Sequence, residues 1–224
     1  MTGKIAAIVP AAGESRRMGR PKLTLPIDGV PLIALVIAAL HEGGTNPVIV
    51  IAPHAEVVGS ADLIHLAQVA GADLVVIPDV QPLDMRASFE LGMRSLAGRP
   101  VSPAMVLLVP ADSPGLTATL VAEVVAYARE HRDRIVVPTF SGRRGHPIAL
   151  PWAFASEVAT LPDNVGINAL VQRHLADVIE LPVNDAGALA DLDTPDDYRR
   201  WSGRGPGSVE NGPRPGPSGR DSEK

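Results

Sequence analysis

The stretch of this sequence best equipped to bind a ligand or to catalyse a reaction is Pro10–Leu23. It reads PAAGESRRMGRPKL and follows the apolar run Ile5–Val9. Its residues include the small Ala11, Ala12 and Gly13, the hydroxyl of Ser15 and four cations, which are Arg16, Arg17, Arg20 and Lys22. Small residues let a ligand approach the backbone, and serine, arginine and lysine side chains can donate hydrogen bonds to phosphate oxygens. Backbone N–H groups and fixed cations together can hold a polyphosphate. We therefore expect a phosphate-binding loop at the end of a strand.

The spacing of this loop excludes two common phosphate-binding fingerprints. A Walker loop requires G-x-x-x-x-G-K-[ST], whereas Gly19 is followed by Arg20, Pro21 and Lys22. A dinucleotide fingerprint requires G-x-G-x-x-G, and the stretch supplies only Gly13 and Gly19. Composition alone leaves a solvated basic loop as the alternative, because runs of charge are usually exposed.

A carboxylate stands at a comparable position later in the chain. Asp112 follows the apolar run Met105–Val109 through Pro110–Ala111 and precedes Ser113–Pro114–Gly115. A carboxylate there could hold Mg²⁺, which takes one or two protein carboxylates together with substrate phosphates. Its neighbours are equally typical of an aspartate that organises a turn, so the residues by themselves leave both interpretations open.

The elements that must position these residues alternate between strands and helices. Short apolar runs predict buried strands at Ile5–Val9, Val48–Ile51, Leu74–Ile77, Met105–Val109 and Ile135–Val137. Helical patterns lie between them at Pro31–His41, Asp62–Ala70, Ala87–Leu96 and Leu120–His131. This alternation predicts a parallel sheet covered on both faces, with ligands beyond the carboxyl ends of the strands. The first loop and Asp112 would then share one edge.

The regular alternation of strand and helix patterns ends in the last third of the chain. The turn residues Ser141–Gly145 predict a hairpin between Ile135–Phe140 and Pro147–Leu150. Short helices near Trp152–Thr160 and Gly166–His174, a strand at Val178–Leu181 and a helix opening at Thr194–Asp197 complete the expected elements. Residues 202–224 are rich in Gly, Pro, Ser and charge without apolar periodicity, so we expect residues 1–201 to form one domain and 202–224 a disordered tail.

Bulk composition narrows the class of function. A net charge of −5 argues against a nucleic-acid binder, and the absence of cysteine excludes disulfides, thiolate metal sites and a cysteine nucleophile. The sequence shows no signal-peptide pattern and no apolar run of about 18 residues. We expect a cytoplasmic protein that binds neither nucleic acid nor membrane; its protein partners stay open.

The pattern A-A-G-x-S-x-R-M-G-x-P-K over Ala11–Lys22 resembles the signature of the MobA-like nucleotidyltransferase family, and most closely that of its molybdenum cofactor cytidylyltransferases. The resemblance implies an α/β protein with a three-layer α/β/α nucleotidyltransferase fold. Such a fold is Rossmann-like and glycosyltransferase-A-like, with a mostly parallel central sheet. It also implies a nucleotide site made of Ala11, Ala12, Gly13, Ser15, Arg17 and Lys22, with Lys22 and Arg17 as catalytic residues.

The same resemblance assigns a metal and an acceptor region. Ala111–Leu116 fits the family's A-D-x-P-x-[LMV] context and Asp191–Tyr198 fits D-[IL]-D-T-P-x-D-[YL], which makes Asp112 and Asp193 the ligands of Mg²⁺, with Mn²⁺ also possible. Asp193 could instead simply precede a well-capped helix. Gly145–His146–Pro147 resembles the family's acceptor-bordering G-H-P element, so His146 could contact an anionic acceptor or serve as an ordinary turn histidine.

Two departures from the family pattern concern the acceptor. Where the molybdenum-cofactor branch shows G-M-x-x-S, this chain has Asp84–Met85–Arg86–Ala87–Ser88. Where it shows G-D-x-G-[AL]-R, this chain has Pro162–Asn168, so an arginine is replaced by Asn168. Arg86 is a substitute candidate for binding the acceptor.

We therefore expect a Mg²⁺-dependent nucleotidyltransferase that moves a nucleotide from an NTP to a small phosphorylated acceptor such as molybdopterin, and releases pyrophosphate. CTP is the expected donor, because cytidylyltransferase members carry Ala-Ala-Gly where guanylyltransferases usually carry Ala-Gly-Gly. The alternatives are a nucleotidyltransferase for a sugar phosphate or another small phosphate, and an inactive nucleotide-binding regulatory domain. A metal-dependent glycosyltransferase ranks low, because Ser113–Pro114 follow Asp112 where Asp-x-Asp is usual.

Overall fold

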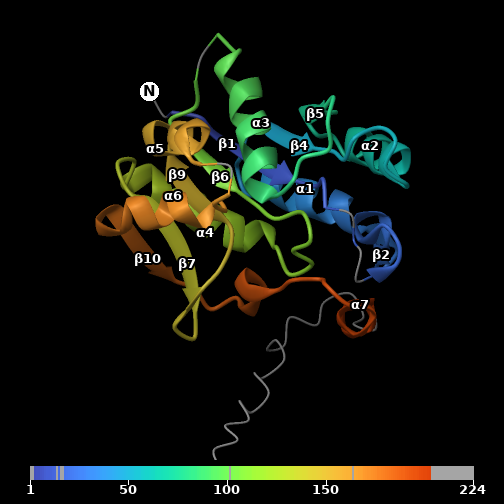
Figure 1. The fold of residues 1–224 in the computed structure, drawn as a ribbon. Helices are drawn as coiled ribbons and strands as arrows, with labels where there is room; N and C mark the ends of the chain where they lie inside the picture. The colour runs from blue at the N-terminus through green and yellow to red at the C-terminus, as the bar shows by residue number, and fades with distance from the viewer. Residues whose placement is uncertain (1–2, 14, 16–17, 101, 163, 203–224) are drawn as a thin grey trace, which may run out of the picture.

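A computed structural model describes residues 3–13, 15, 18–100, 102–162 and 164–202 of the chain. The expected tail comprises residues 202–224. Ser202 is the last residue of the final helix, and residues 203–224 lie outside the described residues. Figure 1 shows the described elements as one layered body.

The strands form a central sheet and a small separate hairpin. Their bounds are β1 (Ile5–Pro10), β2 (Pro26–Ile27), β3 (Val30–Pro31), β4 (Val48–Ile51), β5 (Leu74–Val76), β6 (Met105–Leu108), β7 (Ile135–Phe140), β8 (Arg143–Arg144), β9 (Ile148–Pro151) and β10 (Val178–Pro182). The sheet order is β10-β7-β9-β6-β1-β4-β5, with β8 paired to β7. Neighbouring strands run parallel except where β9 meets β6 and β7 and where β8 meets β7.

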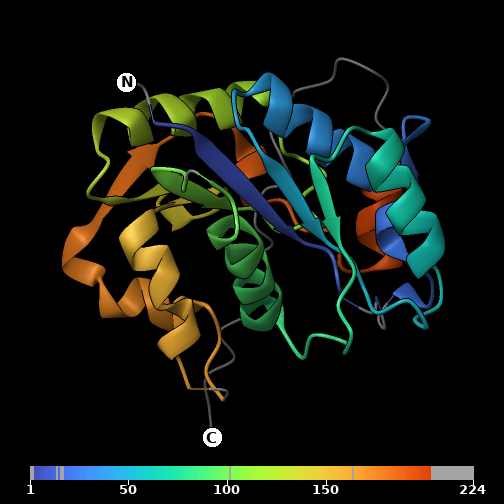
Figure 2. The same ribbon diagram turned by 90° about the horizontal axis from the view of Figure 1, so that it is seen from above.

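Helices cover both faces of this sheet (Figure 2). Their bounds are α1 (Leu32–Glu42), α2 (Ser60–Val69), α3 (Met85–Ala97), α4 (Ala118–Glu130), α5 (Trp152–Ser156), α6 (Asn168–Arg173) and α7 (Pro195–Ser202). Short 3₁₀ turns lie at η2 (Lys22–Thr24), η3 (Glu157–Thr160), η4 (Leu175–Asp177) and η5 (Ala186–Leu189). The fold is a three-layer α/β/α arrangement with a mostly parallel sheet, as the sequence predicts.

The sheet has a hydrophobic core on each of its two faces, which explains why its strands are continuously apolar. Along β1, Ala7 and Val9 pack in a core with residues of α1, α2 and α4, whereas Ala6 and Ile8 pack in a second core with residues of α3, α5 and α6. Alternate residues of a strand point to opposite faces, so a strand buried on both faces cannot carry polar residues at either set of positions. The apolar runs therefore mark the strands closely.

The predicted elements agree with the structure, and this includes the hairpin expected between Ile135–Phe140 and Pro147–Leu150. Val136 of β7 pairs antiparallel with Ala149 of β9, and β8 continues the pairing with β7 next to the turn at Ser141–Gly142. The sequence analysis did not foresee that β9 also pairs with β6 along its whole length. All four residues of β9 are buried, as expected for a strand with neighbours on both edges.

The sequence analysis also missed the β2–β3 hairpin. Its turn is Asp28–Gly29, both at positive φ (48° and 84°), which is the Asp-Gly signal of a tight hairpin. This hairpin follows η2 directly and leads into α1, so it supports the end of the first loop. Within the described residues, no helix is both long and apolar enough to cross a membrane.

Candidate active site

The first loop leaves the sheet at the carboxyl end of β1. Backbone pairing continues one residue past the strand, because the Ala11 N–H donates to the Ile51 carbonyl at 2.9 Å. The loop then returns to η2, where the Lys22 N–H donates to the Ser15 hydroxyl oxygen at 3.2 Å. Ser15 has a φ of 51°, a left-handed conformation that closes the loop on itself. Lys22 is thus held at the first position of η2, with its side chain free to reach across the sheet edge.

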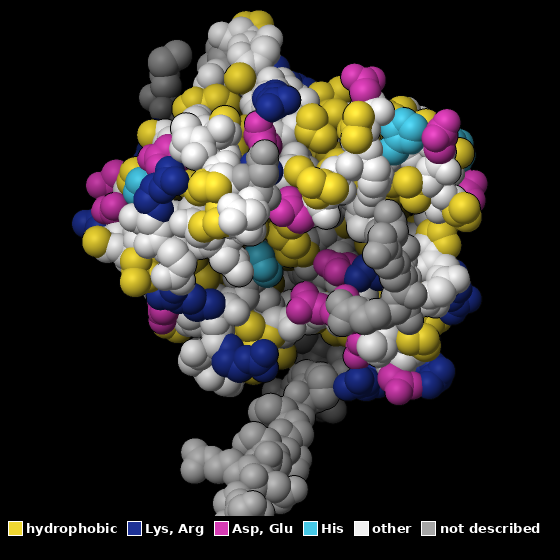
Figure 3. Space-filling view, in the orientation of Figure 1, with side chains coloured by type: hydrophobic (Ala, Val, Ile, Leu, Met, Phe, Trp, Pro, Cys, Tyr) yellow, Lys and Arg dark blue, Asp and Glu magenta, His cyan; other side chains and the backbone are white. Residues whose placement is uncertain are grey.

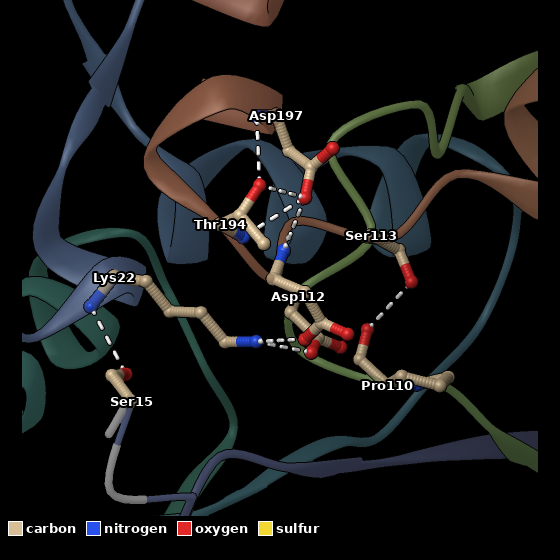
Figure 4. Close-up of polar contacts among 8 residues, drawn as sticks. Ser15, Lys22, Pro110, Asp112, Ser113, Thr194 and Asp197 are labelled. Carbon is tan, nitrogen blue, oxygen red and sulfur yellow. Dashed lines mark hydrogen bonds and ion pairs between the residues drawn. The ribbon is translucent and has the colours of Figure 1, made fainter. Parts of the chain in front are cut away.

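Asp112 lies on a tight turn after β6. The Ser113 hydroxyl donates to the Pro110 carbonyl at 2.9 Å, and the Leu116 N–H donates to the Ser113 carbonyl at 3.2 Å. These bonds are made by the neighbours of Asp112, so the turn does not need the carboxylate of Asp112 to organise it. Its side chain is 26% exposed and points toward Lys22 (Figure 4).

Asp193 reaches the same place from the far end of the chain. The Leu192 N–H donates to the Asp112 carbonyl at 3.0 Å, which fixes the two segments side by side. The next residues form the start of α7, where the Asp197 N–H donates to the Thr194 hydroxyl and the Asp197 carboxylate accepts from Thr194. This reciprocal capping satisfies the helix start as the sequence predicts, and it leaves the carboxylate of Asp193 available to Lys22.

The structure brings these three charged side chains together. The Lys22 Nζ lies 2.6 Å from Asp112 Oδ2 and 3.2 Å from Asp193 Oδ1. Its side chain is 12% exposed, so the ammonium is largely shielded from water by the groups around it. Figure 4 shows the lysine side chain extended toward the carboxylate of Asp112. Residues from three distant segments therefore converge on one point.

A pocket of about 430 Å³ opens beside this cluster. The first loop forms one wall, a segment after β5 forms the other, and the acidic pair lies at one end: Pro10, Ala11, Ala12, Gly13, Ser15, Lys22, Leu23, Gln81, Pro82, Leu83, Asp84, Met85, Ser88, Ala111, Asp112 and Asp193. Figure 3 shows a hollow on this face of the molecule with acidic, basic and histidine side chains at its border. A second pocket of about 370 Å³ lies on the other side of the loop, toward Pro53 and Val57–Gly59.

Close backbone packing holds His146 near enough to Asp112 for the two charges to interact. The His146 N–H donates to the Ala188 carbonyl at 2.9 Å, and a Cβ on the preceding Gly145 would lie 2.1 Å from that same oxygen. Only glycine allows this approach, which explains the G-H-P element physically. Among the described residues, Nδ1 of His146 is buried without a hydrogen-bond partner.

The electrostatics of the site follow from burial and from its acids. Burial lowers the pKa of His146, although the charge of Asp112 opposes the shift, so the imidazole is neutral at neutral pH. Burial raises the pKa of Asp191, and the negative charges of Asp112 and Asp193 raise it further. The site is therefore a local excess of negative charge around one ammonium.

The predicted residues fall into four groups. His146 does not line the pocket, although the charge of Asp112 acts on it. The pocket or its acidic end contains Ala11, Ala12, Gly13, Ser15, Lys22, Asp112 and Asp193. Arg17 lies outside the described residues. Arg86 does not line the pocket: it is 6% exposed on α3, and its guanidinium contacts Glu90 at 3.3 Å on the same helix.

The placement of Arg86 has a simple cause. An arginine four residues before a glutamate on a helix meets it on the same face, and here that face packs against the sheet with Phe89. We therefore do not carry Arg86 into the acceptor site.

Sequence reasoning missed Gln81, which lines the pocket from the wall that follows β5. Its amide bonds to two other loops, and no local pattern marks such a residue. The nearest signal is its position between a predicted strand and a predicted helix at the binding edge.

A divalent cation fits the acidic pair. The two carboxylates both approach one ammonium, so they can also approach one metal ion. Among the described residues, no group of three or more His, Cys, Asp or Glu side chains could hold a metal, so the protein would supply only these two ligands. Two protein carboxylates with the remaining positions filled by phosphates and water is the arrangement Mg²⁺ prefers in nucleotide sites.

Known proteins resemble this chain in sequence, one of them over most of its length. The model of the MobA-like NTP transferase domain matches residues 7–178. A molybdenum cofactor guanylyltransferase of Rhodobacter capsulatus is 30% identical over 209 residues, which cover 90% of this chain and 96% of the relative. A 2-C-methyl-D-erythritol 4-phosphate cytidylyltransferase of Xanthomonas euvesicatoria is 49% identical over 57 residues, 24% of this chain and 22% of the relative.

A solved structure shares the fold. The Mycobacterium tuberculosis H37Rv protein Rv0371c, solved in complex with manganese, superposes with a TM-score of 0.69 at 24% identity. The superposition covers 88% of this chain and 97% of that protein.

Proposed function

The chain belongs to the MobA-like NTP transferase domain family, and on that premise we propose that it transfers a nucleotide from an NTP to a small phosphorylated acceptor of the molybdenum-cofactor class. The observation that carries this proposal is the convergence of Lys22, Asp112 and Asp193 at the end of the pocket beneath the first loop. Such a cluster suits a triphosphate, because phosphate oxygens need both a fixed cation and a metal to neutralise them.

In the proposed reaction, a phosphate oxygen of the acceptor attacks the α-phosphorus of the NTP. A new P–O bond forms, the bond to the bridging oxygen of the β-phosphate breaks, and pyrophosphate leaves with that electron pair. The acceptor oxygen is already anionic, so the protein needs no strong base. Its task is to align the reactants and to stabilise charge in the transition state. Lys22 would supply positive charge to the triphosphate, and Ala11, Ala12, Gly13 and Ser15 would line the nucleotide.

We assign Asp112 and Asp193 as the residues that hold a divalent metal, Mg²⁺ or Mn²⁺. When bound, such a metal would neutralise phosphate charge beside the reacting oxygen. The fit rests on the convergence of the two carboxylates, and the manganese complex of the structural neighbour Rv0371c is consistent with it.

His146 is the proposed contact to the acceptor. Burial lowers its pKa, the charge of Asp112 acts on it, and its buried Nδ1 makes no hydrogen bond of ordinary geometry among the described residues, although its side chain does not line the pocket. A neutral imidazole can accept or donate one hydrogen bond without attracting the metal-bound triphosphate. The molybdenum-cofactor class of acceptor rests on the relatives named molybdenum cofactor guanylyltransferase.

The base of the donor has two candidates. Ala12 is 5% exposed at the pocket, and its methyl group narrows the space beside a base, which favours the smaller CTP. The molybdenum cofactor relatives are named guanylyltransferases, which favours GTP, whereas the shorter cytidylyltransferase match favours CTP. We keep CTP as the expected donor and GTP as the alternative.

The experiment is a screen of CTP, GTP, ATP and UTP against phosphorylated acceptors that include molybdopterin, with Mg²⁺ or Mn²⁺, and pyrophosphate release as the readout. Release that depends on NTP, acceptor and metal supports the proposal. Release only with another small phosphate, such as a sugar phosphate, would reassign the acceptor. Tight nucleotide binding with no release under any combination would favour a regulatory nucleotide-binding domain instead.

A further inference from the structure

The side chain of Gln81 joins three loops at the pocket. Its Nε2 donates to the Ala12 carbonyl at 2.5 Å, and its Oε1 accepts from the His54 N–H at 2.7 Å. A carbonyl can only accept and a backbone N–H can only donate, so these two partners determine which end of the amide is nitrogen and which is oxygen. The orientation of the Gln81 amide is therefore dictated by its neighbours.

These bonds span separate parts of the sheet edge. Ala12 follows β1, His54 follows β4 and Gln81 follows β5, three strands that are neighbours in the sheet. The Gln81 amide thus sets the separation between the first loop and the segment after β5, and these are the two walls of the 430 Å³ pocket.

Gln81 also keeps unused hydrogen-bonding capacity. A primary amide has two N–H donors and two lone pairs on oxygen, and the two bonds just described use one of each. One donor and one acceptor are left on a half-buried side chain that lines the pocket. Donor–acceptor pairs of this kind match the edges of nucleobases, which present N–H and C=O groups side by side.

The position of Gln81 suits the base rather than the phosphates. Lys22, Asp112 and Asp193 contact one another at the pocket, and the triphosphate would lie beside them. The wall that carries Gln81 also holds Pro82, Leu83, Met85 and one charged residue, Asp84, whose carboxylate accepts from the Ala87 N–H at the start of α3. A nucleotide with its phosphates beside Lys22 would direct its base toward this wall.

From these contacts we infer that Gln81 is a specificity-determining residue for the nucleobase, which acts by holding the Ala12 carbonyl in place and by offering its remaining amide groups to the base edge. This role rests on the proposed function, since it requires the pocket to take a nucleotide. It adds to the sequence signature a residue that lies 69 positions after Ala12 in the chain.

The test uses equilibrium titration of the full chain with CTP, GTP, ATP and UTP in the presence of Mg²⁺. Gln81→Glu is nearly isosteric and can still accept from His54, but it cannot donate to Ala12. Gln81→Leu removes both bonds. We expect each variant to weaken binding of the preferred nucleotide about tenfold, because it leaves a polar group of the wall without its partner. We also expect the ratio between preferred and disfavoured nucleotides to narrow.

The matched control is Gln68→Leu, the same change on an exposed position of α2 outside the pocket, which should bind like the parent. If Gln81→Leu does not fold, the nucleotide affinity and selectivity of Gln81→Glu alone test the inference. Parent-like affinity and selectivity in a folded Gln81→Glu protein would overturn the inference alone. An equal loss for all four nucleotides would also overturn it, because a purely structural role predicts that result. A parent chain that binds none of the four would overturn the proposed function as well.

Discussion

The ammonium of Lys22 lies 2.6 Å from the carboxylate of Asp112, a residue 90 positions away in the sequence. The contact joins the first loop to the turn after β6, and Asp193 completes it from the C-terminal segment at 3.2 Å. A lysine in this position neutralises two acids that would otherwise repel each other, and it stands where we propose that a metal binds.

Replacing Lys22 should therefore have two opposite effects. In Lys22→Met, we expect kcat/KM to fall by on the order of 10²–10³, because a fixed cation is lost from the transition state. In the same variant, affinity for Mn²⁺ without nucleotide should rise, because the two carboxylates no longer face an ammonium. Electron paramagnetic resonance titration of Mn²⁺ measures the second effect. Lys4→Met, an exposed lysine, is the control. Unchanged or weaker Mn²⁺ binding would contradict the competition between lysine and metal.

Replacing either acid should abolish metal-dependent turnover. Asp112→Asn and Asp193→Asn keep the side-chain shape but remove a charge that Mg²⁺ requires. We expect activity to fall at least 10²-fold. The melting temperature should change little, because both side chains are partly exposed. Asp196→Asn is the matched control, since Asp196 is an exposed acid at the start of α7. Near-parental activity in Asp193→Asn would place the second metal ligand elsewhere.

The donor preference should depend on the methyl group of Ala12. We expect CTP to lead in competitive turnover, and we expect Ala12→Gly to shift the selectivity toward GTP. One methyl group in a pocket is worth only ~1–3 kcal/mol, so the shift should be about 10- to 100-fold. Turnover led by GTP in the parent would assign it to the guanylyltransferase specificity of its molybdenum cofactor relatives. A selectivity that does not change in Ala12→Gly would refute only the steric explanation.

Acid should weaken the interactions of Glu157 with His174 and Arg173, which lie away from the candidate active site. Burial alone raises the pKa of Glu157, but hydrogen bonds and charges from His174 and Arg173 outweigh it and lower the pKa below its ordinary value. A carboxyl whose pKa is lower in the folded state stabilises the fold above its unfolded pKa of about 4.3, and that contribution disappears as pH falls through the folded pKa.

Glu157→Gln should therefore melt slightly below the parent at pH 7 and approach it below about pH 4. The effect should be small, because the side chain is 33% exposed and its ion pairs are screened by water. Thermal melts over that pH range measure it, with Glu123→Gln on an exposed position of α4 as the control. A difference that grows on acidification would show that the sign is wrong.

The C-terminal segment should be dispensable for folding. Its composition gives it little apolar surface to bury, so truncation after Ser202 should move the melting temperature by no more than about 2 °C. Differential scanning calorimetry of the full and truncated chains makes the comparison. A larger fall would show that the segment contributes to the domain and that the proposed boundary is wrong.

Local patterns along the chain were sufficient to predict the layers of this protein and its family. Strands such as β4 and β6 could be located because a strand buried on both faces must be continuously apolar, and that requirement is local. The pattern over Ala11–Lys22 and the segments around Asp112 and Asp193 identified the family for a similar reason. Each has a spacing that can be recognised without knowledge of its neighbours in space.

The tertiary structure decided what those residues do to one another. The Lys22–Asp112 contact, the approach of Gly145 to Ala188 and the two bonds of Gln81 all join segments far apart in the chain, and no local pattern encodes such partners. Arg86 also shows that a residue's partners cannot be predicted from its type alone. Its charge suggested an acceptor contact, but the face of α3 on which it lies turns it toward Glu90 and the sheet. The types of residue indicated which chemistry the chain can perform. The direction in which each side chain points, and its distance from its partners, depend on the tertiary structure.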